Sequence, residues 1–138
     1  MELLTSSQFK QRFTALVLSA RDWPRRPQDH HVLLISAVVG LDPERSYTEA
    51  EINQHLQRWC LHFGQNLPID HVSLRRYLID AGYLQRDSAG QTYRRAHGPL
   101  SQPFDPEIET LDLEDLIFQA QQEREARRRE HTGGAGSR

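Results

Sequence analysis

The chain has one cysteine, one lysine and no long hydrophobic run. A lone thiol, Cys60, cannot form a disulfide within the chain, which excludes a disulfide-rich scaffold and favours a reducing compartment. The longest apolar stretch, residues 32–39 (VLLISAVV), is too short to cross a bilayer, and the first residues lack a secretory signal pattern. We therefore expect a cytoplasmic protein without a membrane span, and 138 residues suit one domain with tails.

An excess of positive charge is also missing. Seventeen basic residues against nineteen acidic ones give a net charge of −2, unlike a strongly basic, non-specific nucleic-acid binder. The charges are unevenly placed, because residues 71–97 hold five arginines against two aspartates, whereas residues 105–115 hold six acids and no base. Arginine prefers planar, bidentate acceptors such as phosphate or carboxylate, although genome composition explains an arginine bias equally well.

Hydrophobic spacing predicts two helices in the first third of the chain. The first is amphipathic and begins after residues 5–8 (TSSQ), which read as a capping box. Its apolar face consists of Phe9, Phe13, Leu16, Val17 and Ala20. Segment 22–27 (DWPRRP) contains two prolines and is predicted to be a linker, so residues 1–27 form an N-terminal segment. Asp29 is then expected to cap a second helix, which is apolar nearly all round, hence buried, and ends at Gly40.

Two more helices and a hairpin are predicted in the middle of the chain. The third helix follows a capping box at residues 48–51 (TEAE), and the fourth runs from Asp70 to Gly82. The third buries Ile52, Leu56, Trp59 and Phe63, and the fourth has Leu74, Tyr77, Leu78 and Ala81 on one face. Strands 83–86 and 91–94 flank a turn with a glycine at residue 90. This order predicts a mainly α fold with a small β-hairpin, namely a winged helix-turn-helix over residues 28–97 with additional N- and C-terminal helices.

The last third is predicted to be a connector and a helix, residues 98–130, followed by a disordered tail at residues 131–138. Asp105 and Pro106 suit the cap and first position of this helix. Its apolar stripe, Leu113 to Ala120, packs either on its own domain or with the N-terminal helix of a second copy, which makes a homodimer through the terminal helices possible. The acidic run 105–115 is either a solvated helix start or a segment that folds over the basic hairpin and screens it.

The central region resembles a family of uncharacterised bacterial domains. The similarity lies in residues 47–53 (YTEAEIN) and 70–84 (DHVSLRRYLIDAGYL), and Arg86, Gly90, Tyr93 and Arg95 continue it. It covers about residues 28–95. Members of that family are often fused to, or encoded beside, ArsR-type helix-turn-helix regulators, so the resemblance implies a role in transcription.

A winged helix-turn-helix predicts contacts with double-stranded DNA from the fourth helix and the hairpin. The expected nucleic-acid-binding residues are His71, Ser73, Arg75, Arg76, Arg86, Arg94 and Arg95. Internal ion pairs, such as Arg76 with Asp80 one helical turn later, are the alternative role for these arginines. A protein partner docking on the same scaffold is the alternative function. RNA binding through Tyr83 and Tyr93 is a weaker third interpretation, since paired hairpin aromatics more often pack on each other.

Patterns for metal binding or catalysis are missing. Cys60, His62 and His55 supply ligand types, but no Cys-x-x-Cys or His-x-x-x-His pair is present. No nucleophile, base and acid share a recognisable motif, and the glycines do not form a phosphate loop. We therefore expect no metal, no cofactor and no enzymatic activity, with DNA or a protein as the partner.

Overall fold

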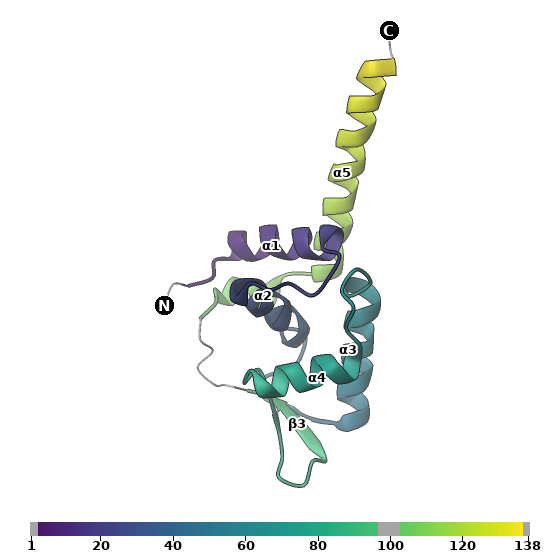
Figure 1. Cartoon of the computed structure of the whole chain (residues 1–138). Coiled ribbons are helices and arrows are strands. Elements are labelled where there is room, and N and C mark those ends of the chain that lie inside the picture. The colour runs from purple at the N-terminus through teal and green to yellow at the C-terminus, as the bar shows by residue number, and fades with distance from the viewer. Residues whose placement is uncertain (1–2, 97–102, 137–138) are drawn as a thin grey trace.

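A computed structural model describes residues 3–96 and 103–136 of the chain, with side chains as far as His131. This part is mainly helical and contains a small three-stranded antiparallel sheet (Figure 1). Its elements, in chain order, are α1 (Ser6–Ser19), α2 (Pro27–Val38), β1 (Ser46–Thr48), α3 (Glu49–Phe63), α4 (His71–Asp80), β2 (Leu84–Arg86), β3 (Thr92–Arg95), the 3-10 helix η1 (Pro106–Thr110) and α5 (Leu113–Gly136). Residue 97 and the beginning of the predicted connector, residues 98–102, lie outside the described residues.

Helix α1 begins and packs as its sequence predicts. The Thr5 hydroxyl accepts a hydrogen bond from the Gln8 N–H at 3.1 Å, and the Gln8 side chain accepts one from the Thr5 N–H at 3.0 Å, so the capping box is formed. Phe9 and Phe13 are fully buried and stack with ring centroids 5.4 Å apart. Phe13 also meets Phe63 edge-on at 5.2 Å, which joins α1 to the end of α3.

The predicted cap of α2 is wrong. The helix begins at Pro27, with Arg26 as the N-cap residue three positions before the predicted one, and the Arg26 side chain makes no capping bond. Proline suits the first helical position because its φ is already helical and its missing N–H would be unsatisfied there. Asp29 instead points inward and accepts two hydrogen bonds from the Arg12 guanidinium of α1, at 3.1 and 3.0 Å. The predicted burial is confirmed, since residues 31–38 are all buried.

Helix α3 buries its predicted face, whereas α4 buries only two of the four residues predicted on its face. The capping box of Thr48 and Glu51 is formed, and the four predicted apolar residues of α3 are buried. In α4, Asp70 caps the helix by accepting from the Ser73 N–H at 2.7 Å. Leu74 and Leu78 are fully buried, but Tyr77 and Ala81, predicted on the same face, are exposed, Tyr77 to 41%.

The hairpin is confirmed, and a third strand joins it. Gly90 has a φ of +71°, as the predicted turn requires. The strands are β2 and β3, and β1 pairs with β3 so that Tyr47 lies opposite Tyr93 and the strand order is β1-β3-β2. Three residues are too few to show an alternating pattern, and the same residues carry the cap of α3, so the sequence analysis missed β1.

The C-terminal part differs from the single helix predicted from Asp105. Asp105 and Pro106 do cap and start a helix, but it is the short 3-10 helix η1. The chain is extended at Leu111, and α5 starts anew with the Asp112 carboxylate accepting from the Asp115 N–H at 3.1 Å. Helix α5 then continues to Gly136, so residues 131–136, predicted to be disordered, are helical, since no proline interrupts the helix.

The terminal segments meet within one chain. Leu4 and Phe104 form a parallel β-bridge, and Ile117 of α5 is buried in the common core. The Arg124 guanidinium donates to the Ser19 hydroxyl at 2.7 Å, so the first half of α5 meets the C-terminal end of α1, while the second half projects from the body (Figure 1). The apolar stripes of the two helices thus pack on their own domain, and Phe118, 56% exposed, is the large apolar residue of α5 left outside. None of the described helices is long and apolar enough to cross a membrane.

Truncating Phe13 tests the role of α1 in the core. Phe13→Ala removes a fully buried ring that contacts both Phe9 and Phe63. We expect the free energy of unfolding in urea to fall by about 3–5 kcal/mol. The control, Phe118→Ala, truncates an exposed ring and should change stability by less than about 0.5 kcal/mol. Equal effects of the two substitutions would contradict the packing described.

Candidate nucleic-acid interface

The predicted site residues lie on α4 and on the β2–β3 hairpin, which are adjacent in the fold (Figure 1). The capping bonds from Ser73 hold α4 in place and lower the pKa of the Asp70 carboxyl. Between helix and hairpin lies a hollow of about 290 Å³. Its lining consists of Val72, Arg75, Arg76, Ile79, Asp80 and Arg86.

Arg75 turns inward and is held by neighbouring side chains. Its guanidinium donates to Asn53 Oδ1 at 2.6 Å and lies 3.5 Å from Glu49 Oε1, and its side chain is 19% exposed. The same Glu49 oxygen accepts a hydrogen bond from the Tyr93 hydroxyl at 3.1 Å. The Arg75 guanidinium lies 5.7 Å from the Tyr93 ring centroid. Arg75 therefore joins α4 to α3 and to β3, and it presents little of its charge to solvent.

Arg95, predicted as a wing contact, is buried. Its guanidinium makes an ion pair with Glu109 of η1 at 2.6 Å and donates to the Leu41 carbonyl at 3.4 Å. Because 9% of this side chain is exposed, it is not accessible to an external ligand in this conformation. The prediction failed here because Leu41 and Glu109 are far from Arg95 in sequence, so nothing local to β3 indicates which way it faces.

Arg76, Arg86 and Arg94 are exposed, but they do not share one face: Arg86 pairs with Tyr93 in the register, so Arg94 lies on the opposite face of the sheet from Arg86. No ion pair involves them among the described residues, and the predicted Arg76–Asp80 pair is not formed. Ser73 is exposed beside Arg76, and His71 is half-buried in the first turn of α4. The structure therefore places five of the seven predicted residues where solvent reaches them and turns Arg75 and Arg95 inward.

The hairpin loop uses its acidic residue internally. The Asp87 carboxylate accepts hydrogen bonds from the Gln91 N–H at 2.7 Å and the Thr92 N–H at 3.2 Å. These bonds lower the pKa of the Asp87 carboxyl and fix the turn that carries Arg86 and Arg94 on its two strands. Asp80 is then the acidic residue that faces the hollow with Arg76 and Arg86.

Two apolar side chains on α4 were not among the predicted site residues. Val72 is 49% exposed and Tyr77 is 41% exposed. Both line a second hollow of about 450 Å³. It also contains Ser73, Arg76, Asp80 and Ala81. The sequence already indicated a mixed surface here, because Val72 and Ile79 share the helix face of Arg75 and Arg76.

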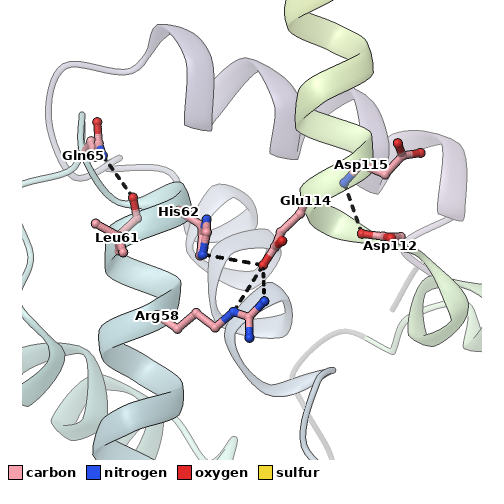
Figure 2. A network of polar contacts seen from close by, with 7 residues as sticks. All are labelled: Arg58, Leu61, His62, Gln65, Asp112, Glu114 and Asp115. Atoms are coloured by element: carbon pink, nitrogen blue, oxygen red, sulfur yellow. Dashed lines mark hydrogen bonds and ion pairs between the residues drawn. The ribbon is translucent and has the colours of Figure 1, made fainter.

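The acidic run reaches the fold at two points. Glu109 neutralises Arg95 at the edge of the hairpin, whereas Glu114 accepts from Arg58 of α3 at 3.0 Å and lies 3.7 Å from His62 Nε2 (Figure 2). The run therefore screens one arginine of the hairpin and fastens the start of α5 to α3. Arg86 and Arg94 are not covered by any described acidic residue of this run.

The histidines and the cysteine form no metal centre in the described part of the chain. His55 Nε2 donates to the Ala37 carbonyl at 2.8 Å, and burial lowers the pKa of this imidazole against the opposing effect of that bond, which leaves the ring neutral at neutral pH. Burial, with a smaller contribution from Asp70, raises the pKa of the Cys60 thiol to about 11. A thiol with such a pKa is a poor nucleophile at neutral pH.

A family of proteins described as uncharacterized and conserved in bacteria, DUF2087, matches residues 20–95. The chain belongs to this family. The DUF2087 match covers α2, the sheet, α3 and α4, and it ends where the resemblance in the sequence ended, at Arg95. Helix α1, η1 and α5 lie outside the DUF2087 region although they complete its core. No curated protein and no solved structure matches the chain significantly.

The ion pair of Arg95 has a measurable consequence for stability. Glu109→Gln leaves a mostly buried guanidinium without a counter-charge, so we expect the free energy of unfolding to fall by about 1–3 kcal/mol. Glu107→Gln, an exposed carboxylate in the same 3-10 helix, is the matched control and should be close to neutral. Equal stability of both variants in urea titrations would show that the pair contributes nothing.

The raised pKa of Cys60 predicts slow alkylation. With a pKa of about 11, roughly one thiol in a thousand is ionised at pH 8, against roughly one in four for an ordinary cysteine. We expect iodoacetamide to label the folded chain at least about tenfold more slowly than the same chain unfolded in urea. Labelling at the same rate in both states would contradict the assigned environment.

Proposed function

We propose that the protein binds double-stranded DNA as a winged helix-turn-helix, with α4 facing the major groove and the hairpin facing the phosphate backbone. The observation that carries this proposal is the division among the arginines around α4. Arg45, Arg58, Arg75 and Arg95 are paired with carboxylates, whereas Arg76, Arg86 and Arg94 are exposed without an ion pair among the described residues. Unpaired guanidinium groups on neighbouring elements suit a polyanion.

The arrangement of elements supports the winged-helix interpretation. Two helices, α3 and α4, are joined by a short connection, and α4 leads directly into an antiparallel hairpin that β1 extends. Such a layout presents one helix and one hairpin side by side, as DNA-binding helix-turn-helix domains require. The sequence resemblance to domains encoded beside ArsR-type regulators favours the same function, a transcriptional regulator.

Arg75, which turns inward, has a supporting role in this proposal. Arg75 connects Glu49, Asn53 and the face of Tyr93, so it fixes the position of α4 relative to β3. Arg76 then contacts base edges or phosphates from α4, together with Ser73 and His71, while Arg86 and Arg94 contact phosphates from the hairpin. Preorganised side chains lose less entropy on binding than mobile ones.

Docking of a protein partner is the second candidate, and the exposed apolar residues of α4 favour it. Val72 and Tyr77 line the hollow of about 450 Å³ next to Arg76, and apolar side chains at a hollow with a polar rim are typical of protein interfaces. This candidate does not require affinity for DNA, so measurement of duplex binding separates the two functions.

Removing the exposed arginines tests the DNA proposal. The triple substitution Arg76→Ala, Arg86→Ala and Arg94→Ala should weaken binding to a fluorescein-labelled duplex by about 100-fold, at roughly 1 kcal/mol per arginine. Fluorescence anisotropy at several salt concentrations should also give a shallower dependence of log K on log salt, by about one for each phosphate that the variant no longer neutralises.

A matched control separates these arginines from net charge. The substitutions Arg127→Ala, Arg128→Ala and Arg129→Ala remove the same number of charges from α5, away from α4. This variant should retain duplex affinity within about threefold at 150 mM salt, where distant charges are screened. Absence of salt-dependent duplex binding by the unmodified chain, or equal losses in both triple variants, would overturn the proposal and leave protein docking as the function.

A further inference from the structure

An aromatic cluster fastens the segment before α2 to the exposed side of α4. We call this segment, residues 21–26, the arm. The Trp23 ring lies 5.3 Å from the Tyr77 ring of α4 and 5.8 Å from the His30 ring of α2, measured between centroids. His30 and Tyr77 also meet edge-on at 6.2 Å, so the three rings form a contact between three elements.

Ring packing is what holds Trp23 in this place. Its indole N–H is buried and makes no hydrogen bond with the described residues. A ring nitrogen of His30 is hydrogen-bonded to the Pro24 carbonyl, which draws the arm toward the start of α2. Proline at residues 24 and 27 restricts the backbone on both sides of Arg25 and Arg26. The arm is therefore anchored at Trp23 and stiffened after it.

The arm carries cations that the fold does not neutralise. Arg25 and Arg26 are exposed and make no ion pair among the described residues. Their Cα atoms are at most about 8 and 11 Å from that of Trp23, because consecutive Cα atoms are about 3.8 Å apart. Trp23 touches Tyr77, and Tyr77 follows Arg76 on α4 and shares the larger hollow with it. Asp22 is the acidic residue of the arm, and its carboxylate accepts the Trp23 N–H at 2.8 Å.

We propose that Arg25 and Arg26 bind backbone phosphates of the same DNA duplex that α4 contacts, and that Trp23 positions them by packing on Tyr77. This inference rests on the proposed function and extends its footprint from α4 and the hairpin to the opposite flank of α4. Arginine suits this role because its planar guanidinium binds phosphate oxygens bidentately.

The test uses the full chain and three sets of variants in the same anisotropy titration with a labelled duplex. Arg25→Ala with Arg26→Ala should weaken binding about 5- to 20-fold and lower the slope of log K against log salt by about two. Arg128→Ala with Arg129→Ala, the charge-matched control, should leave affinity within about twofold and the slope unchanged. Equal effects of the two double variants would overturn the assignment of the arm.

Trp23 is tested as a positioning residue. Trp23→Ala leaves every charge in place but frees the arm, so it should weaken binding about 3- to 10-fold, and Trp23→Phe should restore most of the affinity by keeping a ring on Tyr77. Circular dichroism and urea titration show whether each variant is folded. If Trp23→Ala is not folded, Trp23→Phe and the double arginine variant decide the question.

Failure of this inference differs from failure of the proposed function. If the unmodified chain binds duplex DNA and loses affinity with the α4 and hairpin substitutions, but not with those in the arm, only the arm is wrongly assigned. If the unmodified chain shows no salt-dependent duplex binding, both proposals are wrong.

Discussion

The rest of the structure depends on covering α2, a helix that is apolar on nearly every side. Its residues 31–38 are all buried, so no single neighbour can enclose it. Helix α1 packs along one side, Trp59 of α3 donates its indole N–H to Ser36 at 2.9 Å on another, and Tyr83 at the start of the hairpin meets His31. This need explains why α1 and the C-terminal segment, both outside the DUF2087 region, are part of the same core. Burial of this kind supplies most of the stability of a small domain.

The arginines show how one residue type serves two purposes in a small fold. Arg12, Arg75 and Arg95 each join elements distant in sequence by binding a carboxylate, to Asp29, Glu49 and Glu109 respectively. Each pair lets a charged side chain approach the core because the partner removes most of the cost of burying it. Among the described residues, cations without such partners lie on the surface, for example Arg76 on α4 and Arg128 and Arg129 on α5. The total charge of the chain is near neutral, but its arginines therefore fall into two sets: those paired with carboxylates inside the fold and those exposed on the surface.

Features that depend on neighbouring residues could be predicted from the sequence, whereas contacts between residues far apart in the sequence could not. Both capping boxes, the buried faces of α1 and α3, and the glycine of the hairpin turn depend on residues a few positions apart, so the patterns identified them. The inward turn of Arg75 and Arg95 depends on Asn53, Glu49 and Glu109, which only the folded chain brings near. Asp29 shows the same limit, because a good capping residue also suits an ion pair with Arg12. The sequence thus identified the helix and the hairpin on which these arginines lie, but it did not show which of the arginines face outward.

The shape of α5 has a mechanical consequence. Its last polar link to the body, among the described side chains, is the bond from Arg124 to Ser19, and the twelve residues beyond it form a lever about 18 Å long. If this segment tilts by about 10° at that link, its tip moves by about 3 Å, because the segment is about 18 Å long. Small shifts of α1 against the core are therefore amplified at the tip of α5. A spectroscopic label attached there would report rearrangements of the core that are too small to detect at their origin.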